Sequence, residues 1–156
     1  MKNKKIIISI VIAVFSISLS FNAVSKEPEQ KEPKQANDPR IGLKLTSSEK
    51  VEFLQEMRQM LNSIQGIVSG IGSENREQII KSAKYSGNRM ARATPEAVTK
   101  KLPQLFKSIG GPTHMMFEQL AVIAEDDDME TLTQYTGKLM NQCLQCHETF
   151  KITVVN

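Results

Sequence analysis

The chain has 156 residues, with 20 Lys and Arg, 17 Asp and Glu, two Cys, two His and no Trp. Its first 25 positions hold Lys2, Lys4 and Lys5 and no acidic residue, so residues 26–156 carry 17 basic and 17 acidic side chains. This neutral balance gives no indication of nucleic acid as a partner, and we predict none.

The first 25 residues predict an export signal. A lysine-rich start is followed by an apolar stretch from Ile6 to Phe21 and by the small-residue cleavage site Ala23-Val24-Ser25. Because the apolar stretch is short for a bilayer span, membrane attachment is expected only if the signal is retained. We therefore predict a signal peptide over 1–25 and a periplasmic protein.

Residues 26–45 predict a flexible leader. They are rich in Lys, Glu, Gln and Pro and nearly free of apolar residues, so they cannot bury enough surface to offset the entropy of ordering. The remaining residues, 46–156, are assigned to one folded domain.

Two long amphipathic helices are expected first. Thr46 and Glu49 fit a capping box that opens a helix over 47–71. Its apolar residues recur at three- and four-residue steps and predict one inward stripe: Leu54, Met57, Leu61, Ile64, Val68 and Ile71. A second helix is expected over 74–91, with Ser73 as its N-cap.

The second half of the domain predicts a short helical segment and two further long helices. Thr94 is expected to cap the short segment, and Gly110-Gly111-Pro112 is expected to form a turn, since no Lys-Ser/Thr follows to make a phosphate loop. The third helix is then expected from residue 112. Asp126-Asp127-Asp128 would cap the fourth, over 129–150, and residues 152–155 are expected to finish that helix or fray. The predicted fold class is all-α, an antiparallel four-helix bundle.

The last helix carries Cys143-Leu-Gln-Cys146-His147, the attachment motif of a c-type haem. Two thiols three positions apart lie on one side of a helical turn and can form thioethers with one edge of a porphyrin. His147 then supplies the axial nitrogen. We predict one covalent haem c. A zinc site would need more N or S ligands than this motif holds, and a Cys143–Cys146 disulfide or redox-thiol pair stays open as the alternative.

These residues resemble the class II cytochromes c, which include cytochrome c prime and its low-spin relatives. The resemblance spans residues 47–151. Its specific part is Cys143-x-x-Cys146-His147-x-x-Phe150-Lys151, and its looser part is Leu54-x-x-Met57-Arg58-x-Met60-Leu61. It implies a haem attached near the C-terminus of the last helix of the bundle, one-electron exchange with redox partner proteins, and homodimers as a frequent assembly. No nucleophile–base pair is apparent, and we predict that the protein is not an enzyme.

The family register places Met57 as the sixth iron ligand, which would favour electron transfer. Met60, His114 and an open site remain as alternatives, and the open site would instead bind NO or CO. Where many family members carry an Arg that contacts the haem propionates, this chain has Phe53. The resemblance leaves Arg58, Arg89 or Lys151 for that contact.

Overall fold

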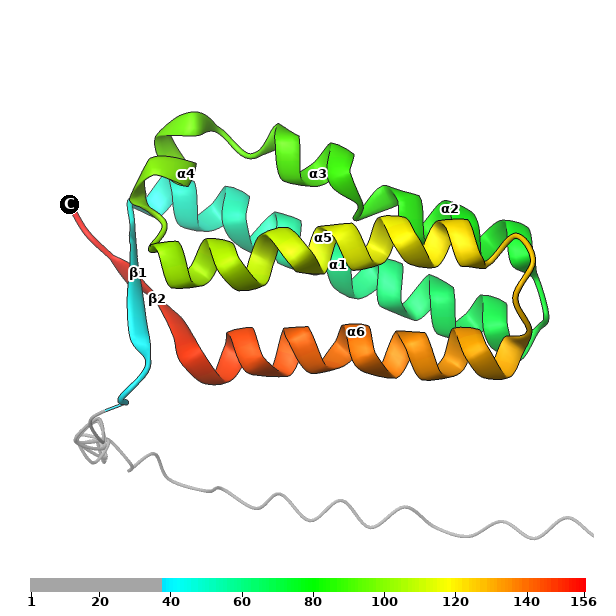
Figure 1. The fold of residues 1–156 in the computed structure, drawn as a ribbon. Helices are drawn as coiled ribbons and strands as arrows, with labels where there is room; N and C mark the ends of the chain where they lie inside the picture. The colour runs from blue at the N-terminus through cyan, green and yellow to red at the C-terminus, as the bar shows by residue number, and fades with distance from the viewer. Residues whose placement is uncertain (1–37) are drawn as a thin grey trace, which may run out of the picture. The chain divides into compact units, whose positions relative to one another are not determined.

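A computed structural model describes residues 38–156, so the predicted signal peptide and most of the predicted leader lie outside the described residues. The described chain is mostly helical and has a small two-stranded sheet (Figure 1). Its elements in chain order are β1 (Ile41–Leu45), α1 (Ser47–Gly72), α2 (Arg76–Tyr85), α3 (Asn88–Ala93), α4 (Glu96–Lys101), α5 (Gln104–Ile123), α6 (Met129–Thr149) and β2 (Phe150–Val154). Over the residues described, no helix is both long and apolar enough to cross a bilayer.

Side-chain caps begin the two longest helices where the sequence predicts them. Glu49 donates its backbone N–H to the Thr46 hydroxyl at 3.3 Å, and the Glu49 carboxylate accepts the Thr46 N–H at 2.8 Å. This reciprocal pair satisfies two helix-end donors and confirms the capping box. At α6, the Asp128 carboxylate accepts the N–H of Thr131 at 2.7 Å and confirms the second expected cap.

The main core lies among α1, α2, α5 and α6. Helix α1 contacts both α2 and α6, and α5 contacts the same two helices from the other side (Figure 1). The side chains enclosed are apolar and almost fully buried: Ile67, Ile79, Ala83, Phe117, Leu120, Ala121, Ala124, Leu132 and Leu139. Burial of such side chains is the main stabilising contribution to the fold.

A second apolar cluster lies at the other end of the domain. Its buried residues are contributed by both strands and by the helices around them: Leu43, Leu45, Phe53, Val98, Leu102, Ile109 and Phe150. We refer to these residues as the strand-end cluster. Because β1 and β2 come from opposite ends of the described chain, this cluster joins the two ends of the domain.

The buried face of α1 differs from the predicted stripe. Leu61 and Val68 are exposed, and the helix instead buries small residues against α2. A Cβ at Gly66 would collide with the Ser82 side chain, and one at Gly70 would lie 2.7 Å from Ile79 Cγ1. Absence of side chains at these two glycines lets the helices approach closely, so the small residues, not the apolar stripe, decide which face meets α2.

The single helix expected over 74–91 is in fact two helices, α2 and α3. Asn75 caps α2 through its side chain, whereas Ser73, the expected N-cap, is the C-cap of α1. The break at Ser86 and Gly87 is held from α5, where the Glu118 carboxylate accepts the N–H of Asn88 at 3.1 Å. This tertiary hydrogen bond supports a helix start that the sequence pattern does not reveal.

Two expectations near the middle of the domain are wrong. Thr94 does not cap α4; its hydroxyl instead donates to the Glu56 carboxylate at 3.5 Å. Helix α5 begins at Gln104 and continues through Gly110, Gly111 and Pro112 without a turn. Pro112 removes one backbone donor, and the glycines cost about 1 kcal/mol each. Burial of residues on both sides of them outweighs these penalties.

The small sheet corrects two predictions. Ile41–Leu45 fall in the flexible leader predicted over 26–45, and residues 152–155 are expected to finish the last helix or fray. Instead β1 and β2 pair in parallel, with Ile41 opposite Phe150 and Leu45 opposite Val154. The ordered domain therefore begins before the predicted boundary at Thr46. The pairing joins segments more than 100 residues apart, which local sequence patterns do not reveal.

Candidate functional site

An apolar cavity of about 560 Å³ lies between the main core and the strand-end cluster. Protein cores normally have few voids larger than a water molecule, and cavities of this size are typical of sites for small molecules or cofactors. Lining residues come from α1, α3, α4, α5 and α6 and from the segments that follow α3 and α4. The cavity is therefore the candidate functional site of the domain.

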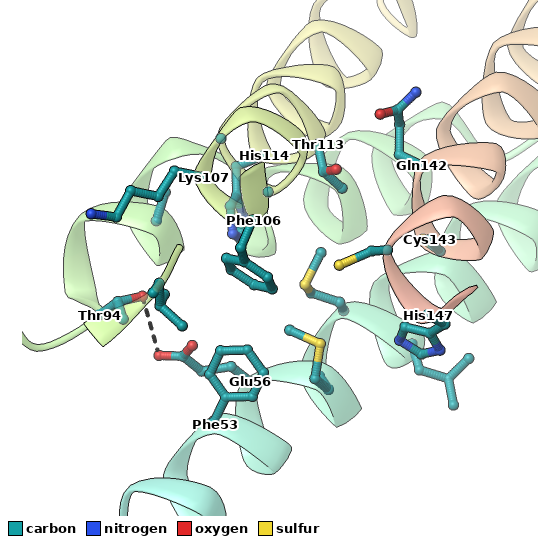
Figure 2. A pocket seen from close by; sticks show the side chains of 18 of the residues that line it. Phe53, Glu56, Thr94, Phe106, Lys107, Thr113, His114, Gln142, Cys143 and His147 are labelled. Carbon is teal, nitrogen blue, oxygen red and sulfur yellow. Dashed lines mark hydrogen bonds between the residues drawn. The ribbon is translucent and has the colours of Figure 1, made fainter. Parts of the chain in front are cut away.

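Helix α6 contributes the whole predicted attachment motif to this cavity. Cys143, Cys146 and His147 all line it, and the two cysteines are half-buried free thiols. Figure 2 shows Cys143 and His147 on neighbouring turns of α6, with Phe53 and Phe106 across the cavity from them. The spacing along the helix thus brings both thiols and the imidazole to one site.

Helix α1 forms the opposite wall with the residues of its predicted apolar stripe. Leu54, Met57, Leu61 and Ile64 all line the cavity. Four of the six residues of the stripe therefore face the cavity. An amphipathic helix normally turns such a stripe toward the core, so this arrangement fits a site whose own ligand contributes to the core.

Met57 and Met60, the two predicted alternatives on α1, both line the cavity and are half-buried. Met57 packs against the strand-end cluster, as does Cys146, whereas Met60 packs against the main core. The structure therefore places Met57, but not Met60, against the same group of residues as the second cysteine of the motif.

Helix α5 presents bare backbone to the cavity at two adjacent positions. Gly110 and Gly111 both line it, and a Cβ at Gly111 would have no protein atom within 4 Å. Phe106 lies one turn before them and covers part of Gly110. A flat group can lie close to the helix at such a position, because no side chain holds it away.

Two cationic side chains line the largely apolar cavity, Arg58 on α1 and Lys107 on α5. Among residues 38–156, neither takes part in an ion pair. The other expected anion contacts lie elsewhere: Arg89 stacks over the ring of Tyr85, and Lys151 donates to the Asp38 carbonyl. Of the three cations predicted to contact the haem propionates, Arg58 thus lines the cavity. Lys107 also lines it, and the sequence did not indicate that residue.

Glu56 also lines the cavity, where Thr94 is its hydrogen-bond partner (Figure 2). Burial raises the pKa of this carboxyl above its ordinary value, and the charge of nearby Glu52 acts in the same direction. The hydrogen bond from Thr94 opposes both effects. The cavity wall therefore holds one carboxyl in an environment that disfavours its charge.

His114 lines the cavity from α5, and its Nδ1 lies 2.7 Å from the main-chain carbonyl of Ser86. Because a carbonyl oxygen only accepts hydrogen bonds, the imidazole donates from Nδ1 in this contact. The ring is thereby anchored to the break between α2 and α3. His114 remains one of the alternatives for the sixth ligand.

The end of α6 is held by residues that precede it by more than 100 positions. Arg40, next to β1, donates from Nη1 to the main-chain carbonyl of His147 at 3.2 Å. Asp38 accepts from Arg40 Nε at 3.0 Å and from Nη2 at 2.7 Å, and these contacts lower the Asp38 pKa to about 2. The last turn of α6, which carries His147, is therefore tied to the segment that leads into β1.

The environment of the thiols differs from that of a redox-active pair. Burial raises the pKa of Cys143 and also that of Cys146, where the neighbouring thiol adds to the effect. Reactive pairs of the thioredoxin type have thiol pKa values lowered by nearby cations or a helix N-terminus. The raised thiol pKa values of Cys143 and Cys146 are the opposite of that pattern.

A haem fits the residues present. The lining supplies two thiols and an imidazole on one wall, thioethers on the opposite wall, a glycine surface and two cations for acidic groups. The sequence indicated the motif, Met57, Met60, His114 and Arg58. It did not indicate Lys107, Gly110, Gly111 or Glu56. Gly110 and Gly111 were interpreted as a turn, and only the continuous α5 helix brings them to the site.

Comparison with known proteins gives no match: no family model, no curated protein and no solved structure is similar to the chain.

Proposed function

We propose that the protein is a periplasmic, monohaem c-type cytochrome of the class II type that carries single electrons between redox partner proteins. One observation carries the proposal: Cys143, Cys146 and His147 line the same apolar cavity as Met57. In this proposal the two cysteines hold haem c through thioethers, His147 is one axial ligand, and Met57 is the sixth.

The proposal includes the bundle itself. Helices α1, α5 and α6, together with α2 and its continuation α3, correspond to the antiparallel four-helix bundle of that family. The contacts of α1 and α5 with both α2 and α6 support this assignment. The family resemblance also favours a homodimer, and a membrane-bound form would require the signal peptide to be retained.

Each wall has its own part in the proposed function. Haem, when bound, supplies the one-electron redox chemistry. The apolar residues of α1 would exclude water from the bound haem, and Arg58 and Lys107 would pair with its propionates. Met57 is favoured over Met60 because it packs against the same cluster as Cys146.

The proposal is tested by producing the full chain together with the c-type maturation machinery and recording its absorption spectrum, oxidised and reduced, with and without CO. A covalently bound, low-spin haem that ignores CO supports the electron carrier with a filled sixth site. A high-spin haem that binds CO favours instead a five-coordinate cytochrome c prime that binds NO or CO. Absence of covalent haem rejects both functions and leaves the disulfide or redox-thiol alternative.

A matched pair of variants shows whether attachment uses the motif. Cys143→Ser should leave at most one thioether, and His147→Ala should abolish stable function. Both variants keep Cys146 and the other residues that line the cavity. Extraction of the haem by acidified organic solvent and the mass of the protein measure the covalent bonds directly.

A further inference from the structure

The carbonyl of His147 lacks the backbone donor that a longer helix would provide. The N–H of Phe150 ends the helix by bonding to the Cys146 carbonyl, and Lys151 already belongs to β2. Carbonyls in the last turn of a helix need partners from outside the helix. For His147 that partner is the guanidinium of Arg40, 107 positions earlier in the sequence.

Arg40 is itself held in place from two sides. Asp38 binds it through both carboxylate oxygens, and the following residue, Ile41, is paired with Phe150 in the sheet. Lys151 completes the arrangement from β2, because its Nζ donates to the Asp38 carbonyl at 2.8 Å and lies 3.8 Å from the Asp38 carboxylate. The three side chains thus form one connected network across the sheet.

We propose that Asp38, Arg40 and Lys151 form a clasp that positions His147 as an axial ligand. This inference rests on the proposed haem function and adds residues that the attachment motif does not contain. A guanidinium at a helix C-terminus also interacts favourably with the helix dipole. The clasp holds the backbone of His147, and through it the direction of the imidazole, so the three residues are positioning residues.

Positioning and simple charge effects predict different results. Arg40 is cationic and Asp38 is anionic, so removing one charge or the other should shift the balance of oxidised and reduced haem in opposite directions if charge alone matters. If the clasp positions His147, loss of either residue frees the same carbonyl. Both variants should then change the orientation of the imidazole in the same way.

The test uses the full chain with haem attached and compares Arg40→Met and Asp38→Asn with wild type. The primary readout is the pattern of haem methyl resonances in the NMR spectrum of the oxidised protein, which follows the orientation of the axial ring. Both variants should change this pattern similarly, and Arg40→Lys, which keeps a donor, should restore part of it. The redox equilibrium measured with a mediator dye should shift in one direction in both variants.

Lys101→Met is the matched control. Lys101 pairs with Glu49 at 2.6 Å and is 40 % exposed, close to the 41 % of Arg40, but it connects α4 with α1. Its loss should leave the methyl pattern unchanged. Asp38→Asn removes less of the network than Arg40→Met, so it tests the clasp even if the latter variant fails to fold.

The outcomes separate the clasp from the proposed function. A wild-type protein without covalent haem overturns the function on which the clasp depends. If the wild type carries haem, two results overturn the clasp alone. One is a haem methyl pattern in Asp38→Asn that equals that of the wild type. The other is a pair of redox shifts of opposite sign in Arg40→Met and Asp38→Asn.

Discussion

The ring of Phe106 lies edge-on to the ring of Phe150, with 5.3 Å between centroids and 70° between planes. The ring of Phe53 is tilted by 52° against that of Phe106, with 5.8 Å between the two centroids. These three rings connect α5 to the strand that follows the cysteine motif and to α1. Aromatic pairs of this geometry stabilise a fold by more than their buried area alone. The three rings therefore help to hold the cavity wall against the strand-end cluster.

Replacing Phe106 by Ala should lower the free energy of unfolding by about 2 kcal/mol or more, because the half-buried ring and both aromatic contacts are lost. Denaturation by urea, followed by circular dichroism, measures the change. Leu105→Ala is the control, because Leu105 is the neighbouring residue and is 50 % exposed. An effect of Phe106→Ala no larger than that of this control would contradict the importance of the array.

Gly111→Leu should reduce the fraction of protein that binds haem and leave the helical fold intact. A Cβ at Gly111 meets no protein atom within 4 Å, but the added side chain would occupy space in the cavity. Leu also has a higher helix propensity than Gly. Haem absorbance per mole of protein, together with circular dichroism, measures both effects.

Gly137→Leu provides the control for Gly111→Leu. Gly137 lies in α6, a Cβ there also meets no atom within 4 Å, and it is not among the cavity residues. Equal haem content in the two variants would show that the α5 surface at Gly111 is not part of the haem site.

Met57→Leu should convert a low-spin spectrum to a high-spin one and allow CO to bind, because the thioether is lost while the volume is nearly conserved. Met60→Leu should keep the low-spin spectrum. The absorption spectra of both reduced variants with CO provide the measurement. If only Met60→Leu becomes high-spin, the sixth ligand is Met60; if neither does, the remaining predicted candidate is His114.

Glu56→Gln should stabilise the protein increasingly as the pH rises from about 4 to about 7. Burial raises the pKa of Glu56 in the folded protein, so the folded state holds this proton more tightly than the unfolded state does. Its ionisation therefore lowers stability once the pH passes the unfolded value, and the amide avoids that loss. Urea unfolding of both proteins at the two pH values checks the sign. A constant difference would contradict it.

Glu52→Gln is the control for this pH dependence. Glu52 lies one helical turn before Glu56 on α1, is exposed and does not line the cavity. Its replacement removes a nearby like charge without removing a buried carboxyl. The free energy of unfolding of Glu52→Gln, relative to that of wild type, should therefore change less with pH than the corresponding value for Glu56→Gln.

The sequence by itself determined the features that depend on neighbouring residues. The Thr46–Glu49 box, the Asp128 cap and the bounds of α1 and α6 agree closely with expectation, because caps and helical periodicity involve contacts within one or two turns. The Cys143–His147 motif was also evident, since its five residues lie on consecutive positions of one helix.

The tertiary structure decided what depends on distant partners. Pairing of β1 with β2 orders one segment predicted to be flexible and another predicted to finish the last helix or fray. Burial of the residues around Pro112 keeps α5 helical through that position. Gly66 and Gly70 turn the apolar stripe of α1 toward the cavity by letting α2 approach the other face. Each outcome depends on packing between segments far apart in the sequence, and such packing outweighs local propensity when it buries more apolar surface.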